Sequence, residues 1–141
     1  MELHFTGTGA AYYPRLGSNA AFFVKNNHLF MIDCGESTFR KMEARDEIRT
    51  CDKITVFITH LHADHIGSLG SFASYCLSVL QKRITVIAAV NVFSEGYLAV
   101  QVAAEAARHE ARSEVPVIAF SIVRKETMYQ SENQKLLFPM T

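Results

Sequence analysis

Three histidines and an aspartate stand close together in the middle of the sequence, in a pattern that could hold metal ions. They lie in the segment Thr59-His60-Leu61-His62-Ala63-Asp64-His65-Ile66-Gly67, which contains three of the six histidines of the chain. Imidazole nitrogens and carboxylate oxygens suit zinc, and manganese also accepts such ligands. A metal ion held here would lower the pKa of a bound water and so supply hydroxide for hydrolysis near neutral pH. We therefore expect His60, His62, Asp64 and His65 to be metal ligands.

The spacing of these four residues favours the end of a strand over a helix. In a helix of about 3.6 residues per turn, His60 and His62 would point about 200° apart and could not share one ion. On extended backbone, positions 60, 62 and 64 project to one side, because strand side chains repeat every two residues. His65 is offset by one residue and aims at a different point, which favours two neighbouring ions over one closed site. The alternative is a solvated, histidine-rich surface loop.

The elements on either side of this segment form a recognisable order. Residues 53–59 are a β-branched run typical of a buried strand, and Ser68 is placed to cap a helix with apolar residues at helical spacing. Upstream, the pattern predicts a strand, a hairpin and a short helix; downstream, it predicts a strand, an alanine-rich helix and a final strand. The expected ranges are 3–5, 20–32 (turn at 25–28), 38–45, 84–88, 95–112 and 116–123. Hairpins followed by alternating strands and helices predict a layered α/β domain.

Composition limits what else the chain could be. With 141 residues, 15.8 kDa and 49% hydrophobic residues, it fits one domain spanning residues 1–141 with a real core. Fourteen basic and fourteen acidic residues give no net charge, which argues against a strongly cationic nucleic-acid-binding module. No apolar run approaches the ~20 residues that span a bilayer, and Met1–Phe5 does not open a secretory signal. Three widely spaced cysteines form no disulfide framework, so we expect a cytoplasmic protein that does not bind membranes.

The metal-ligand segment resembles the H-x-H-x-D-H signature of the metallo-β-lactamase superfamily. Three upstream stretches sharpen this resemblance towards its ribonuclease Z-like and phosphodiesterase-like branch, and they are residues 5–10 (F-T-G-T-G-A), 18–20 (S-N-A) and 30–38 (F-M-I-D-C-G-E-S-T). The resemblance covers residues 2–88 and fades beyond them. It implies an α/β fold of the metallo-β-lactamase-like αββα type, of which this chain has the N-terminal half followed by a divergent C-terminal part. It also implies hydrolysis by metal-activated hydroxide.

The same resemblance assigns roles to individual residues. It implies that His60 and His62 hold a first ion, that Asp64 and His65 hold a second, and that the catalytic Asp64 handles the proton of the attacking water. Asp33 matches an aspartate that orients a ligand histidine through its other ring nitrogen. The alternative for Asp33 is a turn residue at the end of a strand. The expected cofactor is Zn²⁺, one or two ions, or Mn²⁺.

The resemblance leaves the ligand set incomplete. Family members add a histidine for each ion and a bridging aspartate from their second half, whereas Asp64 is the last aspartate of this chain. His4 and His28 are interpreted as structural or exposed, and His109 as a residue near the end of the alanine-rich helix. The leading hypothesis is a phosphodiesterase or ribonuclease Z-like hydrolase of small molecules, with nucleic acid only as a substrate. The alternatives are a thioester or lactone hydrolase, and a truncated or divergent metal-binding remnant, for which exposed sheet surfaces would favour a homodimer.

Overall fold

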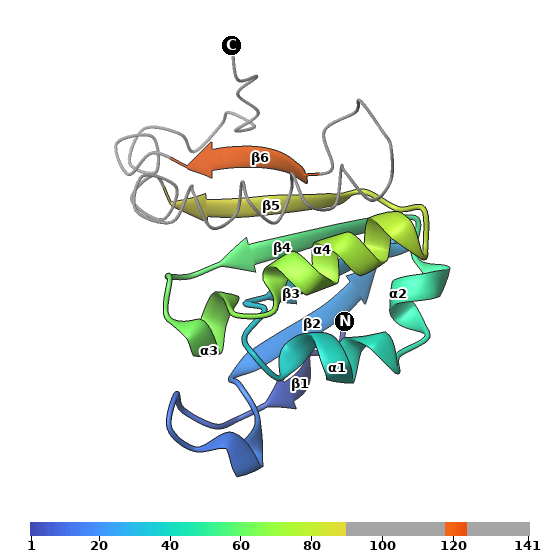
Figure 1. The fold of residues 1–141 in the computed structure, drawn as a ribbon. Coiled ribbons are helices and arrows are strands. Elements are labelled where there is room, and N and C mark those ends of the chain that lie inside the picture. The colour runs from blue at the N-terminus through green and yellow to red at the C-terminus, as the bar shows by residue number, and fades with distance from the viewer. Residues whose placement is uncertain (90–117, 124–141) are drawn as a thin grey trace.

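A computed structural model describes residues 1–89 and 118–123, and these form one sheet with helices packed against it (Figure 1). The six strands of the sheet lie in the order β1-β2-β3-β4-β5-β6. In chain order the elements are β1 (His4–Gly7), the 3₁₀ helix η1 (Pro14–Leu16), β2 (Ala20–Lys25), β3 (His28–Ile32), α1 (Thr38–Glu43), α2 (Glu47–Thr50), β4 (Lys53–Ile58), α3 (Ala63–Ile66), α4 (Leu69–Ser78), β5 (Ile84–Ala89) and β6 (Ile118–Val123).

The sheet changes character along its width. Strands β1, β2 and β3 are antiparallel neighbours, and the β2–β3 hairpin turns through Asn26 and Asn27, whose φ angles of 52° and 58° are left-handed. Asparagine tolerates that conformation, so the predicted hairpin is confirmed with its predicted turn. Strands β3 to β6 are all parallel. The carboxyl ends of these parallel strands therefore meet at one edge, where α/β sheets commonly bind ligands.

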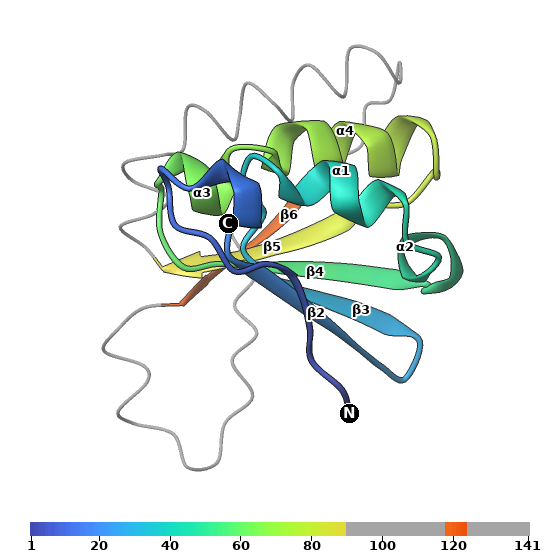
Figure 2. The same cartoon turned by 90° about the horizontal axis from the view of Figure 1, so that it is seen from below.

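The helices lie on one face of the sheet. Figure 2 shows α1, α3 and α4 above the strands, because the segments that connect the parallel strands β3, β4 and β5 cross over the same side. The predicted helix at 38–45 is α1, and its Met42 is fully buried as expected. None of the helices among the described residues is long and apolar enough to cross a bilayer.

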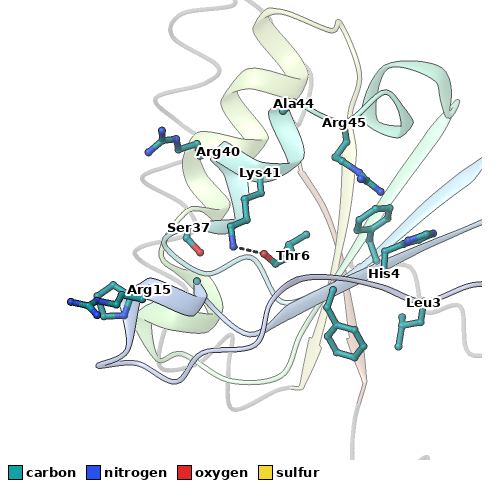
Figure 3. Close-up of a pocket in the computed structure, with 13 residues that line it drawn as sticks. Leu3, His4, Thr6, Arg15, Ser37, Arg40, Lys41, Ala44 and Arg45 are labelled. Atoms are coloured by element: carbon teal, nitrogen blue, oxygen red, sulfur yellow. Dashed lines mark hydrogen bonds between the residues drawn. The ribbon is translucent and has the colours of Figure 1, made fainter.

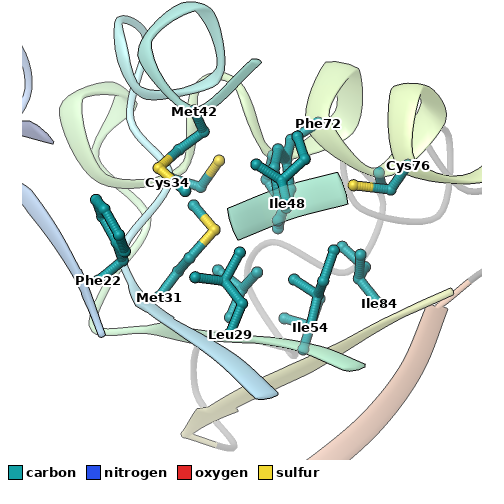
Figure 4. Close-up of a cluster of buried hydrophobic side chains, with 14 of the residues drawn as sticks. Phe22, Leu29, Met31, Cys34, Met42, Ile48, Ile54, Phe72, Cys76 and Ile84 are labelled. Atoms are coloured by element: carbon teal, nitrogen blue, oxygen red, sulfur yellow. The ribbon is translucent and has the colours of Figure 1, made fainter. Parts of the chain in front are cut away.

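The core lies between this face and the helices (Figure 4). Alternate strand residues point into it, because successive strand side chains face opposite sides of a sheet. Its fully buried members include Phe22, Leu29, Met31, Met42, Ile48, Ile54, Val56, Phe72, Ile84 and Val86. The opposite face carries a row of rings, with the Phe30 centroid 4.9 Å from that of Phe23 and 6.3 Å from that of Phe57.

Two sequence expectations need correction or fall outside the described residues. Ser68 precedes α4 as predicted, but its side chain does not cap that helix. Its hydroxyl instead bonds the Gly35 carbonyl and accepts from the Phe39 backbone N–H at 3.1 Å, because the 34–39 segment is packed against it. The predicted strand at 116–123 corresponds to β6. The alanine-rich helix at 95–112 and His109 lie outside the described residues.

Candidate metal centre

The His/Asp cluster, defined as His60, His62, Asp64 and His65, lies directly after the central parallel strand β4. Its four residues lie on a short loop at 59–62 and on the one-turn helix α3. The backbone stays extended as far as His62, with φ −66° and ψ 147°. Asp64 and His65 lie inside α3, so the expectation that positions 60, 62 and 64 share one extended segment is wrong. The helical turn begins at Ala63, earlier than the sequence predicts. The loop and α3 still place the four side chains close to one another.

Asp33 is the anchor of this cluster. It follows β3, has a left-handed φ of 63° that aspartate tolerates, and is 4% exposed. Its carboxylate accepts from the Thr59 backbone N–H at 2.8 Å and from the Thr59 hydroxyl at 2.8 and 2.9 Å. It also lies 2.7 Å from Nδ1 of His65. Asp33 thus makes the turn after a strand and also contacts a cluster histidine, while its part in orienting a metal ligand stays a prediction.

These hydrogen bonds orient two imidazole rings in the same way. A carboxylate can only accept, so the 2.7 Å contact with Asp33 places a proton on Nδ1 of His65. The Thr59 hydroxyl donates to Asp33, so its 3.0 Å contact with Nδ1 of His60 is one in which His60 donates. Nε2 of His60 then carries a lone pair and faces His62, whereas Nε2 of His65 faces the Asp64 carboxylate at 3.2 Å. This is the arrangement by which proteins prepare histidines for metal ligation.

The four side chains lie as two pairs. Nε2 of His60 is 3.2 Å from Nδ1 of His62, and Nε2 of His65 is 3.2 Å from Oδ2 of Asp64. Two ligands at about 2.0–2.1 Å from one tetrahedral zinc ion would be about 3.3 Å apart. The pairs are neighbours, because the ring centroids of His60 and His65 are 3.9 Å apart.

Asp64 gives a further sign that the donors suit metal ions. Its Oδ1 atom is buried and has no hydrogen-bond partner among the described residues. A buried, unpartnered carboxylate oxygen costs free energy unless a cation or proton satisfies it. Within residues 1–89 and 118–123, no three His, Cys, Asp or Glu side chains converge on one point. The donor set therefore fits ions held by two of these ligands each, with the remaining positions filled from elsewhere.

A buried contact between backbones holds α3 against the Asp33 segment. The Cys34 N–H donates to the His65 carbonyl at 2.7 Å, and the Ser68 N–H donates to the Cys34 carbonyl at 3.0 Å. Gly35 makes this approach possible, because a Cβ added there would lie 1.8 Å from the Asp64 carbonyl oxygen. The D-C-G-E stretch thus orients the histidines through hydrogen bonds and packs closely against the Asp64 backbone.

Sequence reasoning gave Thr59 no role, although its hydroxyl joins Asp33 to His60. The signal available was its place between a buried strand and the first histidine. His4 and His28 lie apart from the cluster, as expected. His4 stacks on Phe22 at 5.0 Å, and His28 contacts Thr55 at 2.8 Å.

The three cysteines do not belong to the site. All three are buried, and burial raises the pKa of the Cys34 and Cys76 thiols from 9.0 to about 12. Burial also raises the pKa of the Cys51 thiol. Neutral, buried thiols are poor nucleophiles and poor metal ligands, so we do not count the three cysteines among the candidate ligands.

A hollow of about 290 Å³ opens beside Asp64. Glu36, Ser37 and Arg40 also line it, which places a carboxylate, a hydroxyl and a guanidinium within the space that borders the cluster. Space of this size beside a carboxylate of the His/Asp cluster suits a small substrate group.

Comparison with known proteins agrees with this geometry. Residues 1–134 match the family model of the anti-Pycsar protein Apyc1. The Apyc1 protein of Bacillus phage 010DV004 is 39% identical over 85 residues, covering 59% of this chain and 32% of that protein. Ribonuclease Z of Streptococcus uberis is 42% identical over 79 residues, covering 52% of this chain and 25% of that protein. The chain thus spans between a quarter and a third of the length of these relatives.

Solved structures show the same fold. Human tRNase Z, short form, superposes with a TM-score of 0.59 at 24% identity, covering 88% of this chain and 45% of that one. The metallo-β-lactamase fold protein YhfI of Bacillus subtilis gives a TM-score of 0.61 at 11% identity, covering 86% and 44%. The predicted α/β fold of metallo-β-lactamase type is confirmed, and it corresponds to roughly half of each of these structures. The chain belongs to the family of the anti-Pycsar protein Apyc1, within the metallo-β-lactamase superfamily.

Proposed function

We propose that this chain carries the metal-binding half of a phosphodiesterase that hydrolyses cyclic nucleotides. The observation that carries the proposal is the His/Asp cluster, in which two ligand pairs, each 3.2 Å apart, lie side by side. Membership of the Apyc1 family, which degrades cyclic nucleotides, supports this substrate class over the thioesters and lactones also considered.

His60 and His62 would hold one ion, and Asp64 and His65 the other. Metal ions bound there would activate the attacking water and offset the negative charge that develops on the phosphoryl oxygens. Thr59 holds Nδ1 of His60 and Asp33 holds Nδ1 of His65, so the Nε2 atom of each ring is left on the side away from these two hydrogen bonds. The first task of this chain's own residues is therefore to fix two ligand rings before any ion arrives.

Asp64 has a second task in the proposed reaction. Its carboxylate would accept a proton from the attacking water. The water oxygen forms a new bond to phosphorus, one P–O ester bond of the cyclic phosphate breaks, and a proton reaches the departing sugar oxygen. The product is a linear nucleoside monophosphate. Atoms and charge balance without an oxidant or a second substrate.

The test is turnover of 3′,5′-cyclic cytidine and adenosine monophosphates by the full chain with added zinc or manganese. We expect His62→Ala to lower turnover at least about a hundredfold, because one ion loses half of its ligands from this segment. His28→Ala is the matched control, since His28 lies on the hairpin and contacts Thr55. Turnover that survives His62→Ala unchanged would contradict the proposal. Cleavage of a precursor tRNA without cyclic-nucleotide turnover would assign the chain to ribonuclease Z chemistry.

A second candidate is a metal-binding chain without turnover. It is favoured by the observation that the described residues present ligand pairs and no group of three. Metal analysis separates the candidates. Two ions per chain with turnover support the phosphodiesterase, whereas bound metal without hydrolysis of any phosphodiester supports the second candidate.

A further inference from the structure

A second hollow, of about 860 Å³, lies between β1, η1 and α1 (Figure 3). Four cationic side chains line it, and no Asp or Glu is among its lining residues; the four are Arg15, Arg40, Lys41 and Arg45. We call this space the cationic hollow. Its volume lies within the range of pockets that enclose small organic ligands, about 300–1,000 Å³. None of the His/Asp cluster lines it.

The positive charge of the cationic hollow is only partly neutralised. Arg45 pairs with Glu47 at 3.2 Å. Arg15, Arg40 and Lys41 form no ion pair within the part of the chain that the structure describes, and the Lys41 ammonium donates to the Thr6 carbonyl. A concave wall with unpaired cations concentrates positive potential and attracts anions. Guanidinium groups are well suited to phosphate, because they present paired N–H donors.

One end of the cationic hollow offers flat rings. The Arg45 guanidinium carbon lies 4.9 Å from the centroid of the Phe22 ring, and His4 stacks on the same ring at 5.0 Å. Figure 3 shows Arg45 and His4 on one side of the space and Arg15, Ser37 and Arg40 on the other, with Lys41 between them. The Nε atom of Arg45 is buried and has no hydrogen-bond partner among the described residues. The Phe22 ring is only 2% exposed, whereas the His4 side chain is 38% exposed. The His4 ring is therefore the surface at this end on which a planar heterocycle could stack, while the cations at the other end suit a phosphate.

The cationic hollow adjoins the hollow beside Asp64. Pro14, Gly17, Ser37 and Arg40 line both. Arg40 therefore lies on a wall that the two hollows share, although the other charged residues that line them differ. This position makes the cationic hollow a separate space next to the His/Asp cluster.

We propose that the cationic hollow binds a nucleoside monophosphate, with its phosphate between Arg15 and Arg40 and its base against the His4 ring. Arg15 and Arg40 are exposed and make no side-chain hydrogen bond to another described residue, so they are free to contact a ligand. The proposal does not depend on cyclic-nucleotide hydrolysis, because it concerns residues outside the His/Asp cluster.

The test is calorimetric titration of the full chain with adenosine 5′-monophosphate in the presence of a metal chelator. We expect binding that persists in His62→Ala, weakens as salt is raised, and falls at least tenfold in the double variant Arg15→Gln/Arg40→Gln. Lys25→Gln/Lys53→Gln is the matched control, because it removes the same charge from two exposed lysines that line a different hollow. The control should bind as the parent chain does, and the melting temperature of each variant confirms that it folds.

Three results would overturn the proposal. The first is no binding of the nucleotide to the chelated protein. The second is an equal loss of affinity in the two double variants, which would indicate net charge alone. The third is inorganic phosphate binding as tightly as the nucleotide, which would remove any role for the rings. Failure of hydrolysis with intact nucleotide binding would refute the proposed function and leave this inference standing.

Discussion

The His/Asp cluster and the cationic hollow border a common wall but are built in different ways. The cluster comes from one short segment after β4, and its rings are fixed by a buried carboxylate at 4% exposure. The hollow draws its cations from η1, α1 and the residues that follow α1, on long and mostly exposed stems. A substitution in the frame of the cluster should therefore cost stability or metal affinity. A substitution in the hollow should cost ligand binding and little else.

The largest expected effect is the loss of stability when the packing of residue 35 against the Asp64 backbone is disturbed. Gly35→Ala should lower the free energy of unfolding by about 3 kcal/mol, because the added Cβ meets a backbone carbonyl that cannot move aside cheaply. In the structure that contact would be 1.8 Å long. Urea denaturation measures the change. Ser71→Ala, at an exposed position of α4, is the control and should be neutral or slightly stabilising, because alanine favours helices.

Equal stability of Gly35→Ala and the parent chain would contradict the contrast between a rigid cluster and an adaptable hollow. It would mean that α3 can shift away from the 34–35 segment, and that the cluster is no more rigid than the hollow.

The next effect is on metal affinity. Asp33→Asn keeps the shape of the side chain and tolerates the left-handed φ of 63°, but it removes the charge that orients His65 and Thr59. Zinc affinity, measured by competition with a chromogenic chelator, should fall about 10- to 100-fold. Asp52→Asn is the control, since Asp52 pairs with Asn27 on the exposed hairpin. Unchanged zinc affinity in Asp33→Asn would show that the cluster does not need its anchor.

The last prediction concerns the unsubstituted chain and the chemical access to its thiols. Burial raises the pKa of the Cys76 thiol to about 12, so the folded protein keeps it protonated and shielded. At pH 8 the native thiols should react with a disulfide reagent at under about 1% of the unfolded rate, whereas acylation of exposed Lys41 should be rapid.

The raised pKa of the Cys76 thiol also determines how the stability of the fold changes with pH. The folded state holds the thiol proton more tightly than the unfolded state, so this contribution to stability is complete below pH 9.0 and is lost as pH rises towards about 12. Fast labelling of native Cys76 at pH 8 would show that the interior behind the cluster opens as readily as the hollow.

Much of the fold could be predicted from local patterns. The β2–β3 hairpin follows from two asparagines between apolar runs, and β4 and β5 follow from β-branched runs. The helical turn at Asp64 could not be predicted, because four residues carry too little periodicity. The role of the Ser68 side chain was also hidden. Its partners lie in a distant segment of the sequence, 33 positions away at Gly35 and 29 at Phe39.

The amino-acid sequence by itself determined which residues could bind metal, because the four donors lie within one short stretch and need only local geometry to meet. It also determined the order of the strands and of the helices α1 and α4, since hydrophobic periodicity is a property of neighbouring residues. The tertiary structure alone decided that Asp33, 32 positions before His65, orients that ring. It alone also gathered Arg15 with Arg40 and Lys41 around one space. Contacts of this kind depend on sheet register and on how α1 packs beside β1, and no local pattern encodes either.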